Sequence, residues 1–398
     1  DDAMSINSLD PAYNANQSGP RTVTVTRRFQ NRFPNGTVLN FINPQTGVEI
    51  SGGVLESQAP PDSNSPVNEG QVVLTFAADL PTIPANAGVN FADPALRAAQ
   101  STIEDNVVED TPFGHGIFVG GSVQVTVQRN LVKTTRCDGI AIRQTTKQFY
   151  DAPVHDVTVR DNRLINVLGP GCGTTKSLAS INVVSIDDLF GFATGPANTN
   201  VAVMNNFIAD SGRSGIFFGA ASGGSVQGNY ISRWYTQPTL ALWNLDPMWN
   251  NQVLADFPLP IAFRNTTGVL NVNNQTNSGP TPAISLTSVT PSSAPAGSPD
   301  TTVTLNGSFL PGSVAFLGST ALQTTYVSAT QVTALLPSAE LKVSSSRAIT
   351  VQNPDPSGTS SGSAVFQVLA KRRGQITSIA HRTRSAWTRK PMRVIAAR

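Results

Sequence analysis

The 398-residue sequence is poor in charged residues, in cysteine and in long apolar runs, and each shortage excludes a class of protein. Charged residues make up 13% of the chain, about half of the ~25% typical of globular proteins. Two cysteines are too few for a disulfide-rich scaffold or a zinc site, and for Cys137 and Cys172 we favour chance thiols over a single disulfide. No apolar run reaches the roughly 18 residues of a transmembrane helix. The start at Asp1-Asp2 is not signal-like and predicts the interior of a larger protein.

The small net charge of +2 conceals an uneven distribution. Residues 371–398 hold nine Lys or Arg and no acid, which leaves 18 bases against 25 acids in residues 1–370. A body with a negative net charge disfavours nucleic-acid binding. The basic tail, residues 370–398, could bind polyanions, but a disordered end is the interpretation we favour.

What the sequence does contain is a repeat of short β-branched strands that run into Asn. The clearest copies are Thr102–Asn106, Val125–Asn130, Val157–Asn162 and Val201–Asn206. A second mark follows eight or nine residues after the Asn in three places, at His115-Gly116-Ile117, Asp138-Gly139-Ile140 and Ser214-Gly215-Ile216. Units of about 22 to 24 residues with several short strands and no helical period indicate a right-handed parallel β-helix over residues 96–276, with residues 1–19 as the end of one coil.

The repeat also predicts what each position does. Equivalent residues of stacked coils form columns about 4.8 Å apart. Ile103, Val127, Val159 and Val203 each lie three residues before the Asn, so we expect them in one buried interior column. The Asn series suits a tight turn, in which Asn adopts left-handed geometry and bonds along a ladder.

Two further β units flank the solenoid. Residues 20–95 alternate in short strands without the Asn mark, which predicts a small β-barrel inserted into the solenoid. We expect its entry and exit strands, residues 3–8 and 101–108, to be neighbours. Residues 282–369 form a second Ser/Thr-rich series of alternating strands. The fold class is therefore all-β.

The C-terminal series resembles the IPT/TIG family of immunoglobulin-like domains. The resemblance rests on Ser288–Gly297, Leu305-Asn306-Gly307-Ser308-Phe309 and Gln352-Asn353-Pro354. It implies an immunoglobulin-like β-sandwich that serves as a spacer or binding unit of a bacterial surface protein.

The first 235 residues resemble a glycoside hydrolase family of exo-acting α-1,3-galactosidases. In that family an Asp-Asp-Ala segment closes one coil and leads into an inserted barrel, as Asp1-Asp2-Ala3 precedes residues 20–95 here. A later family motif resembles Phe149–Val157. This chain departs from the family at Ser5 and Asn7, where Asn and His are usual, and at Asp151-Ala152-Pro153, where Glu-Ser-Gly is usual.

Glycoside hydrolysis requires one carboxylic acid to protonate the leaving oxygen and one carboxylate to activate water or attack carbon. The resemblance implies that Asp1 and Asp2 supply the base side and that Asp151 occupies the place of another active-site acid. We expect all three to face one cleft. The chain carries no Gly-rich phosphate loop, paired-His zinc motif or Gly-x-Ser-x-Gly elbow, so we expect neither a cofactor nor a metal.

The repeat itself suggests a second set of candidate site residues, independent of the family resemblance. His115 and Asp138 precede equivalent Gly-Ile pairs, so they should lie one coil apart in one column, with Arg143 beside them. A carboxylate beside an imidazole and a guanidinium could bind a sugar or stabilise developing charge. Trp234 could stack on a sugar face, although use in the core is the more common role of such a residue.

These observations favour a secreted, carbohydrate-active β-helix protein, and within that class a glycoside hydrolase of α-galactoside-like linkages. A polysaccharide lyase and a non-enzymatic surface protein that binds glycans remain alternatives. The expected partner is a glycan or polysaccharide, and the expected location is extracellular or at the cell surface.

Overall fold

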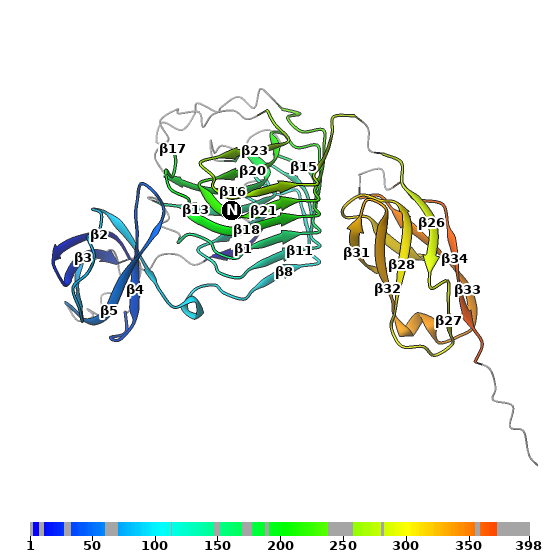
Figure 1. The fold of residues 1–398 in the computed structure, drawn as a ribbon, viewed down its shortest axis with the longest axis horizontal. Coiled ribbons are helices and arrows are strands. Elements are labelled where there is room, and N and C mark those ends of the chain that lie inside the picture. Colours follow the sequence, from blue (N-terminus) through cyan, green and yellow to red (C-terminus); the bar gives the residue numbers. More distant parts are fainter. Residues whose placement is uncertain are drawn as a thin grey trace, which may run out of the picture.

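The computed structural model describes residues 3–7, 12–27, 33–59, 71–112, 114–146, 152–168, 177–187, 191–237, 258–279, 282–354 and 359–371. Within these ranges the chain is built almost entirely of strands, arranged as a parallel β-helix, a closed barrel and an immunoglobulin-like sandwich. The barrel and the sandwich lie on opposite sides of the β-helix (Figure 1). No helix in the described residues is long and apolar enough to cross a membrane.

Three parallel sheets form the walls of the β-helix, and each of six coils contributes one strand to each sheet. Sheet 1 contains β1 (Met4–Asn7), β10 (Ile117–Gly120), β13 (Ile140–Thr145), β16 (Ala179–Asp187), β20 (Ser214–Gly219) and β23 (Ile261–Arg264). Sheet 2 contains β8 (Thr102–Glu104), β11 (Thr126–Gln128), β14 (Thr158–Arg160), β18 (Asn198–Met204), β21 (Ala221–Gln227) and β24 (Leu270–Val272). Sheet 3 contains β9 (Val107–Glu109), β12 (Leu131–Thr135), β15 (Arg163–Val167), β19 (Phe207–Ala209), β22 (Tyr230–Ser232) and β25 (Gln275–Asn277). A short strand, β17 (Gly191–Phe192), pairs antiparallel with β16.

The interior column is confirmed. Val127 pairs with Ile103 on one side and with Val159 on the other, and Val159 pairs with Val203. All four are at most 5% exposed and belong to one apolar cluster that fills the solenoid. Burying such a column of β-branched side chains stabilises the solenoid, because each contributes about 1.5–3 kcal/mol when removed from water.

The Asn ladder is also confirmed, with one correction. At the corner between sheets 2 and 3, Asn130 Nδ2 donates to Asn162 Oδ1 and to Ile103 O, both at 3.0 Å, and the pattern repeats along the axis. The left-handed conformation belongs to the residue before each ladder Asn, such as Arg129 or Asp161, and not to the Asn itself. The ladder Asn is needed for its amide, which satisfies backbone groups in the neighbouring coil.

The barrel begins earlier than the sequence indicated. Its strands are β2 (Ala12–Gly19), β3 (Thr22–Arg27), β4 (Val38–Ile42), β5 (Glu49–Ala59), β6 (Gln71–Phe76) and β7 (Ala87–Phe91). Residues 12–19 therefore belong to the barrel and not to a β-helix coil. Because β1 pairs with β10 and β8 pairs with β11, the barrel is inserted within one coil, at the corner between sheets 1 and 2.

The C-terminal sandwich has its own apolar core, separate from that of the solenoid. One sheet contains β26 (Ser285–Thr290), β28 (Thr301–Ser308), β32 (Gln331–Leu336) and β31 (Gln323–Ser328). The other contains β27 (Ser293–Pro295), β34 (Ala364–Leu369), β33 (Ser345–Gln352), β29 (Val314–Leu317) and β30 (Thr320–Ala321).

Candidate functional site on the outer face of sheet 1

The outer face of sheet 1 is buried and carries polar side chains. Ile117 points into the solenoid core, so the next residue along the strand points outward. Phe118 and Asn182 occupy such outward positions, and both are buried. The barrel reaches this sheet, since Gln144 Nε2 donates to Gly47 O at 3.0 Å. A polar group on this face therefore lies in a desolvated environment.

His115 and Asp138 meet at the edge where strands of sheet 1 begin. Gly116 N donates to Asp138 O at 3.0 Å, which stacks the two residues in one column, and His115 Nδ1 lies 3.3 Å from Asp138 Oδ2. The Gly of the repeated mark is a packing requirement. A Cβ at Gly139 would lie 2.7 Å from a side-chain carbon of Leu164, so only Gly allows the chain to turn in so tightly.

Arg143 completes this group from the same face of β13. One guanidinium nitrogen lies 3.3 Å from His115 Nε2, and the guanidinium carbon lies 5.5 Å from the centre of the Phe118 ring. Because an arginine can only donate, Nε2 of His115 must accept. The proton of a neutral His115 is then on Nδ1, the nitrogen that lies 3.3 Å from Asp138 Oδ2.

Asp138 has more hydrogen-bonding capacity than these neighbours use. Asn182 Nδ2 donates to Asp138 Oδ2 at 3.0 Å. Asp138 is completely buried, and its Oδ1 has no hydrogen-bond partner among the described residues. A buried acceptor without a partner is unfavourable by about 1–3 kcal/mol. A further hydrogen-bond donor would satisfy it.

The structure thus brings together His115, Asp138 and Arg143, as the sequence predicted. It adds Asn182 and Phe118, which sequence reasoning missed. The coil of Asn182 has Ser180 in place of the marking Gly, although Ile181 pairs with Ile140. Aligning coils on the inward Ile rather than on the Gly would have identified Asn182.

The three acids taken from the family resemblance, Asp1, Asp2 and Asp151, lie outside the described residues. Trp234 does not join the group. It packs, partly buried, against the core of the solenoid, several coils along the axis from His115. This packing is the core role that the sequence weighed against sugar stacking.

The sequence favoured free thiols for the two cysteines, and the structure shows a disulfide at one of them. Cys137, next to Asp138, is disulfide-bonded, and Cys172 lies outside the described residues. The preference for chance thiols was therefore wrong for Cys137. A covalent link beside Asp138 restrains the turn that presents its carboxylate.

A second charged group lies where the barrel meets the solenoid, and no pattern in the sequence indicates it. Glu49 Oε2 of the barrel lies 3.4 Å from a guanidinium nitrogen of Arg97 and 3.5 Å from His155 Nε2. Arg97 also donates to Pro153 O at 2.9 Å. Burial acts to raise the pKa of Glu49, but the hydrogen bond from His155 and the charge of Arg97 together hold that pKa below its ordinary value.

Comparison with known proteins gives two partial matches. The family described as periplasmic copper-binding protein (NosD) matches residues 67–255, and the IPT/TIG domain family matches residues 285–368. No curated protein matches the chain. Among solved structures, the tailspike protein gp49 from Pseudomonas phage LKA1 is 10% identical, over 92% of this chain and 82% of that one, with a TM-score of 0.17. At that TM-score the likeness supports no argument about fold or activity.

The name of the first family raises the question of copper. Copper favours thiolate, thioether and imidazole ligands. In the described part of the chain no group of three or more His, Cys, Asp or Glu could hold a metal ion. Cys137 is in a disulfide, and His115 and His155 belong to separate ion-paired groups. The described residues therefore do not fit a copper ion.

The parallel sheets, the Asn ladder and the two family matches agree with one another. The protein is a parallel β-helix that is similar over much of its solenoid to the NosD family and that carries an inserted barrel and an IPT/TIG domain.

Proposed function

We propose that the protein is a carbohydrate-active enzyme that binds a glycan on the outer face of sheet 1 and hydrolyses terminal α-galactoside-like linkages. The observation that carries the proposal is the buried group of His115, Asp138 and Arg143, in which Asp138 Oδ1 has no hydrogen-bond partner among the described residues. Such a group offers a charged donor and a charged acceptor in a desolvated setting, where hydrogen bonds to sugar hydroxyls are strongest.

In this proposal Asp2 and Asp151 act as the pair of catalytic carboxyl groups, with Asp1 beside them. The described neighbours of these acids support the idea. Ala3, which follows Asp2 directly, donates from its N–H to His115 O at 3.1 Å. Asp151 directly precedes Ala152, which is buried.

The other residues would position the sugar. Asp138 Oδ1 accepts a hydroxyl of the substrate, while Arg143 donates to a ring or leaving-group oxygen. Asn182 and His115 hold the Asp138 carboxylate in place. Glycosidases obtain several kcal/mol from hydrogen bonds that strengthen in the transition state.

The test is hydrolysis of a panel of aryl and oligosaccharide α-galactosides by the wild type and by Asp2→Asn, Asp151→Asn and Asp138→Asn. We expect kcat to fall by roughly 100-fold or more in each variant, as when an essential carboxylate or a transition-state hydrogen-bond partner is removed. Asp79→Asn, an exposed acid on the barrel, serves as the matched control and should be as active as the wild type. Equal turnover by Asp2→Asn, Asp151→Asn and the wild type would reject the assignment.

A second candidate is a surface protein that binds glycans without cleaving them. It is favoured by one observation, that the described residues around Asp138 hold one carboxylate and not two. Glycan binding that depends on Asp138, with no product from α-galactosides or from uronate polysaccharides, would establish this candidate instead.

We further propose that the protein acts outside the cytoplasm. The disulfide at Cys137 supports this location, because disulfides persist in oxidising compartments. Fractionation of cells that express the natural gene would test it, and recovery of the protein in the cytosol with a free Cys137 thiol would contradict it.

A further inference from the structure

The immunoglobulin-like domain docks on the solenoid at one end of sheet 3 and leaves a cavity at the other. Leu310 packs with Phe207 and Tyr230, whose rings stack with centroids 5.6 Å apart. Arg163 of the preceding coil donates to Pro354 O at 3.3 Å. The same column continues in the first two coils, where Leu131 is only partly buried and Val107 is 64% exposed.

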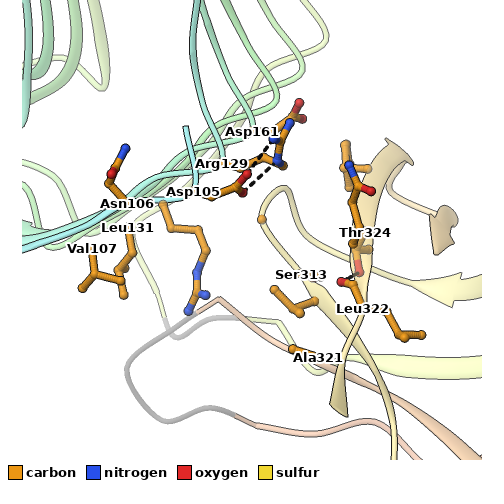
Figure 2. A pocket seen from close by; sticks show the side chains of 15 residues that line it. Asp105, Asn106, Val107, Arg129, Leu131, Asp161, Ser313, Ala321, Leu322 and Thr324 are labelled. Atoms are coloured by element: carbon orange, nitrogen blue, oxygen red, sulfur yellow. Dashed lines mark hydrogen bonds and ion pairs between the residues drawn. The ribbon is translucent and has the colours of Figure 1, made fainter. Parts of the chain in front are cut away.

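A cavity of about 600 Å³ lies in this open part, between the solenoid and β29–β31 of the immunoglobulin-like domain (Figure 2). This volume is in the range of pockets that hold small ligands. One wall is the corner between sheets 2 and 3, with Asp105, Arg129 and Asp161 in one column. The opposite wall is β31, which contributes Gln323 and the half-buried Tyr326.

The charges that line the cavity balance. Arg129 donates to Asp105 through two nitrogens at 2.9 and 2.7 Å, and Asp161 and Arg163 supply one further charge of each sign. A lining with no net charge gives no electrostatic advantage to a polyanion or a polycation. It suits a neutral ligand that needs both donors and acceptors.

The same cavity also offers apolar surface and an unused acceptor. Val107, Leu131 and Leu322 provide aliphatic surface between the charged groups. Asp161 Oδ1 is buried without a hydrogen-bond partner among the described residues. A pyranose has polar edges and apolar faces, so it matches a site in which carboxylates, guanidinium groups and amides alternate with aliphatic and aromatic surface.

We propose that this interdomain cavity is a second carbohydrate site, which binds one or two residues of a neutral oligosaccharide without cleaving them. The inference rests on the cavity and not on the chemistry proposed at sheet 1. If both sites exist, the cavity would hold the same chain of sugars at a distance from the catalytic face, as an accessory binding site does.

A peptide strand added to the edge of β31 is the competing occupant, because β31 is the last strand of its sheet. The structure disfavours it. The pairing of β31 is irregular between Tyr326 and Ser328, which interrupts the edge that an added strand would need. The ion-paired wall opposite β31 also matches hydroxyl groups better than apolar side chains.

The experiment is titration of the full chain, by calorimetry, with neutral disaccharides that include galactobiose, and with a uronate-containing disaccharide as the anionic comparison. Val107→Trp fills the cavity from an exposed position. Val343→Trp makes the same change at a comparably exposed valine outside the cavity lining and is the matched control. We expect a neutral disaccharide to bind the wild type and Val343→Trp equally, and Val107→Trp at least tenfold more weakly, because the indole occupies the volume of a sugar ring.

Asp138→Asn separates this site from sheet 1. Binding that survives Asp138→Asn and is lost in Val107→Trp supports the cavity. Binding lost in Asp138→Asn and kept in Val107→Trp, preference for the uronate disaccharide, or capture of a peptide with no affinity for any disaccharide would each overturn the proposal. Failure of α-galactoside hydrolysis would reject the enzyme and leave this result unaffected.

Discussion

The solenoid carries a domain on each side, and the two junctions are built in different ways (Figure 1). At the barrel, the turn at residues 43–48 packs against side chains of two neighbouring coils: Thr146 Oγ1 donates to Pro44 O at 2.9 Å, and Gly47 packs against Gln144 and Ser185. At the immunoglobulin-like domain, contact is concentrated around Leu310, and a cavity remains beside it. The first junction resembles a domain interior, whereas the second resembles a binding interface. The barrel is therefore structurally integrated with the solenoid, whereas the C-terminal domain is attached to the solenoid surface.

The two junctions also differ in how well each satisfies its buried carboxylate. Glu49 at the barrel has a lowered pKa, because His155 and Arg97 outweigh the effect of its burial. Asp161 beside the cavity has a raised pKa, chiefly because burial outweighs the charge of Arg160. One junction satisfies its carboxylate, and the other leaves it partly unsatisfied and available to a ligand.

Gly47→Ala should have the largest effect on stability, because it disrupts the more tightly packed junction, between the barrel and the solenoid. Gly47 has a φ of +70°, and an added Cβ would lie 2.6 Å from Gln144 Oε1 and 2.7 Å from Ser185 Oγ. We expect a loss of about 3 kcal/mol or more, combining left-handed strain with overpacking. Chemical denaturation, with proteolysis of the barrel as a second measurement, would show it.

Gly36→Ala provides the control within the same barrel. Gly36 has a φ of +87° and no atom within 4 Å of an added Cβ, so it carries the strain without the clash and should lose only about 1–2 kcal/mol. If the two variants were equally stable, the turn at residues 43–48 would not be held by the solenoid, and the comparison of the junctions would fail.

Glu49→Gln tests the charge at the barrel junction. It leaves the buried guanidinium of Arg97 without its carboxylate, which should lower the free energy of unfolding by about 2–3 kcal/mol at neutral pH. Because the folded pKa of Glu49 lies below its ordinary 4.5, the stabilisation is complete above pH 4.5 and is lost as the pH falls through the folded pKa. Unfolding curves from pH 7 to pH 3 should therefore converge for the wild type and Glu49→Gln. Parallel curves would show that the carboxylate charge contributes nothing.

The solenoid was predictable and the junctions were not, for a physical reason. The first five coils place an apolar residue at the position of Val127, and all six place an amide at the position of Asn130, so the sequence repeats the constraint and reveals the register. Glu49, Arg97 and His155 meet once, from three separate parts of the chain, and no period marks them. A contact made once between domains leaves no pattern in a single sequence.

The candidate site on sheet 1 was partly predictable from the sequence, less so than the solenoid and more so than the junctions. His115 and Asp138 were predictable because they share a column with a repeated Gly-Ile mark, and the structure confirms their proximity. Asn182 was missed because its coil replaces that Gly by Ser180. The left-handed residue of each corner was assigned to the ladder Asn, since Asn tolerates that geometry, but the structure uses the preceding residue and reserves Asn for hydrogen bonding.

Leu310→Ala addresses the second junction and should have a smaller effect than Gly47→Ala and Glu49→Gln. Leu310 is buried against Phe207 and Tyr230. Its truncation should weaken docking by about 2 kcal/mol, the low end for a buried leucine. The expected readout is faster protease cleavage between the solenoid and the C-terminal domain, with little change in the unfolding of either. Leu369→Ala, at an exposed position of the same domain, should cleave at the wild-type rate. Equal cleavage of the wild type and Leu310→Ala would mean that other contacts hold the domain.

Asp161→Asn should have the smallest effect and the opposite sign to Glu49→Gln. The raised pKa means that the folded state holds its proton more tightly than the unfolded state. The wild type therefore loses stability as the pH rises from the ordinary value of 3.8 through the folded pKa, and stays at the lower level above it. An amide of the same shape removes this penalty, and the lost pair with the partly exposed Arg160 is worth little. We expect Asp161→Asn to be as stable as the wild type at pH 7, or more stable by less than about 1 kcal/mol.

Asn also tolerates the left-handed backbone conformation of this corner, and that gain in stability does not depend on pH. Only the part of the gain that disappears below pH 3.8 can therefore be assigned to the loss of the carboxylate charge. A variant less stable than the wild type at neutral pH would show that Arg160 satisfies the carboxylate after all, and the contrast between the two junctions would then rest on packing alone.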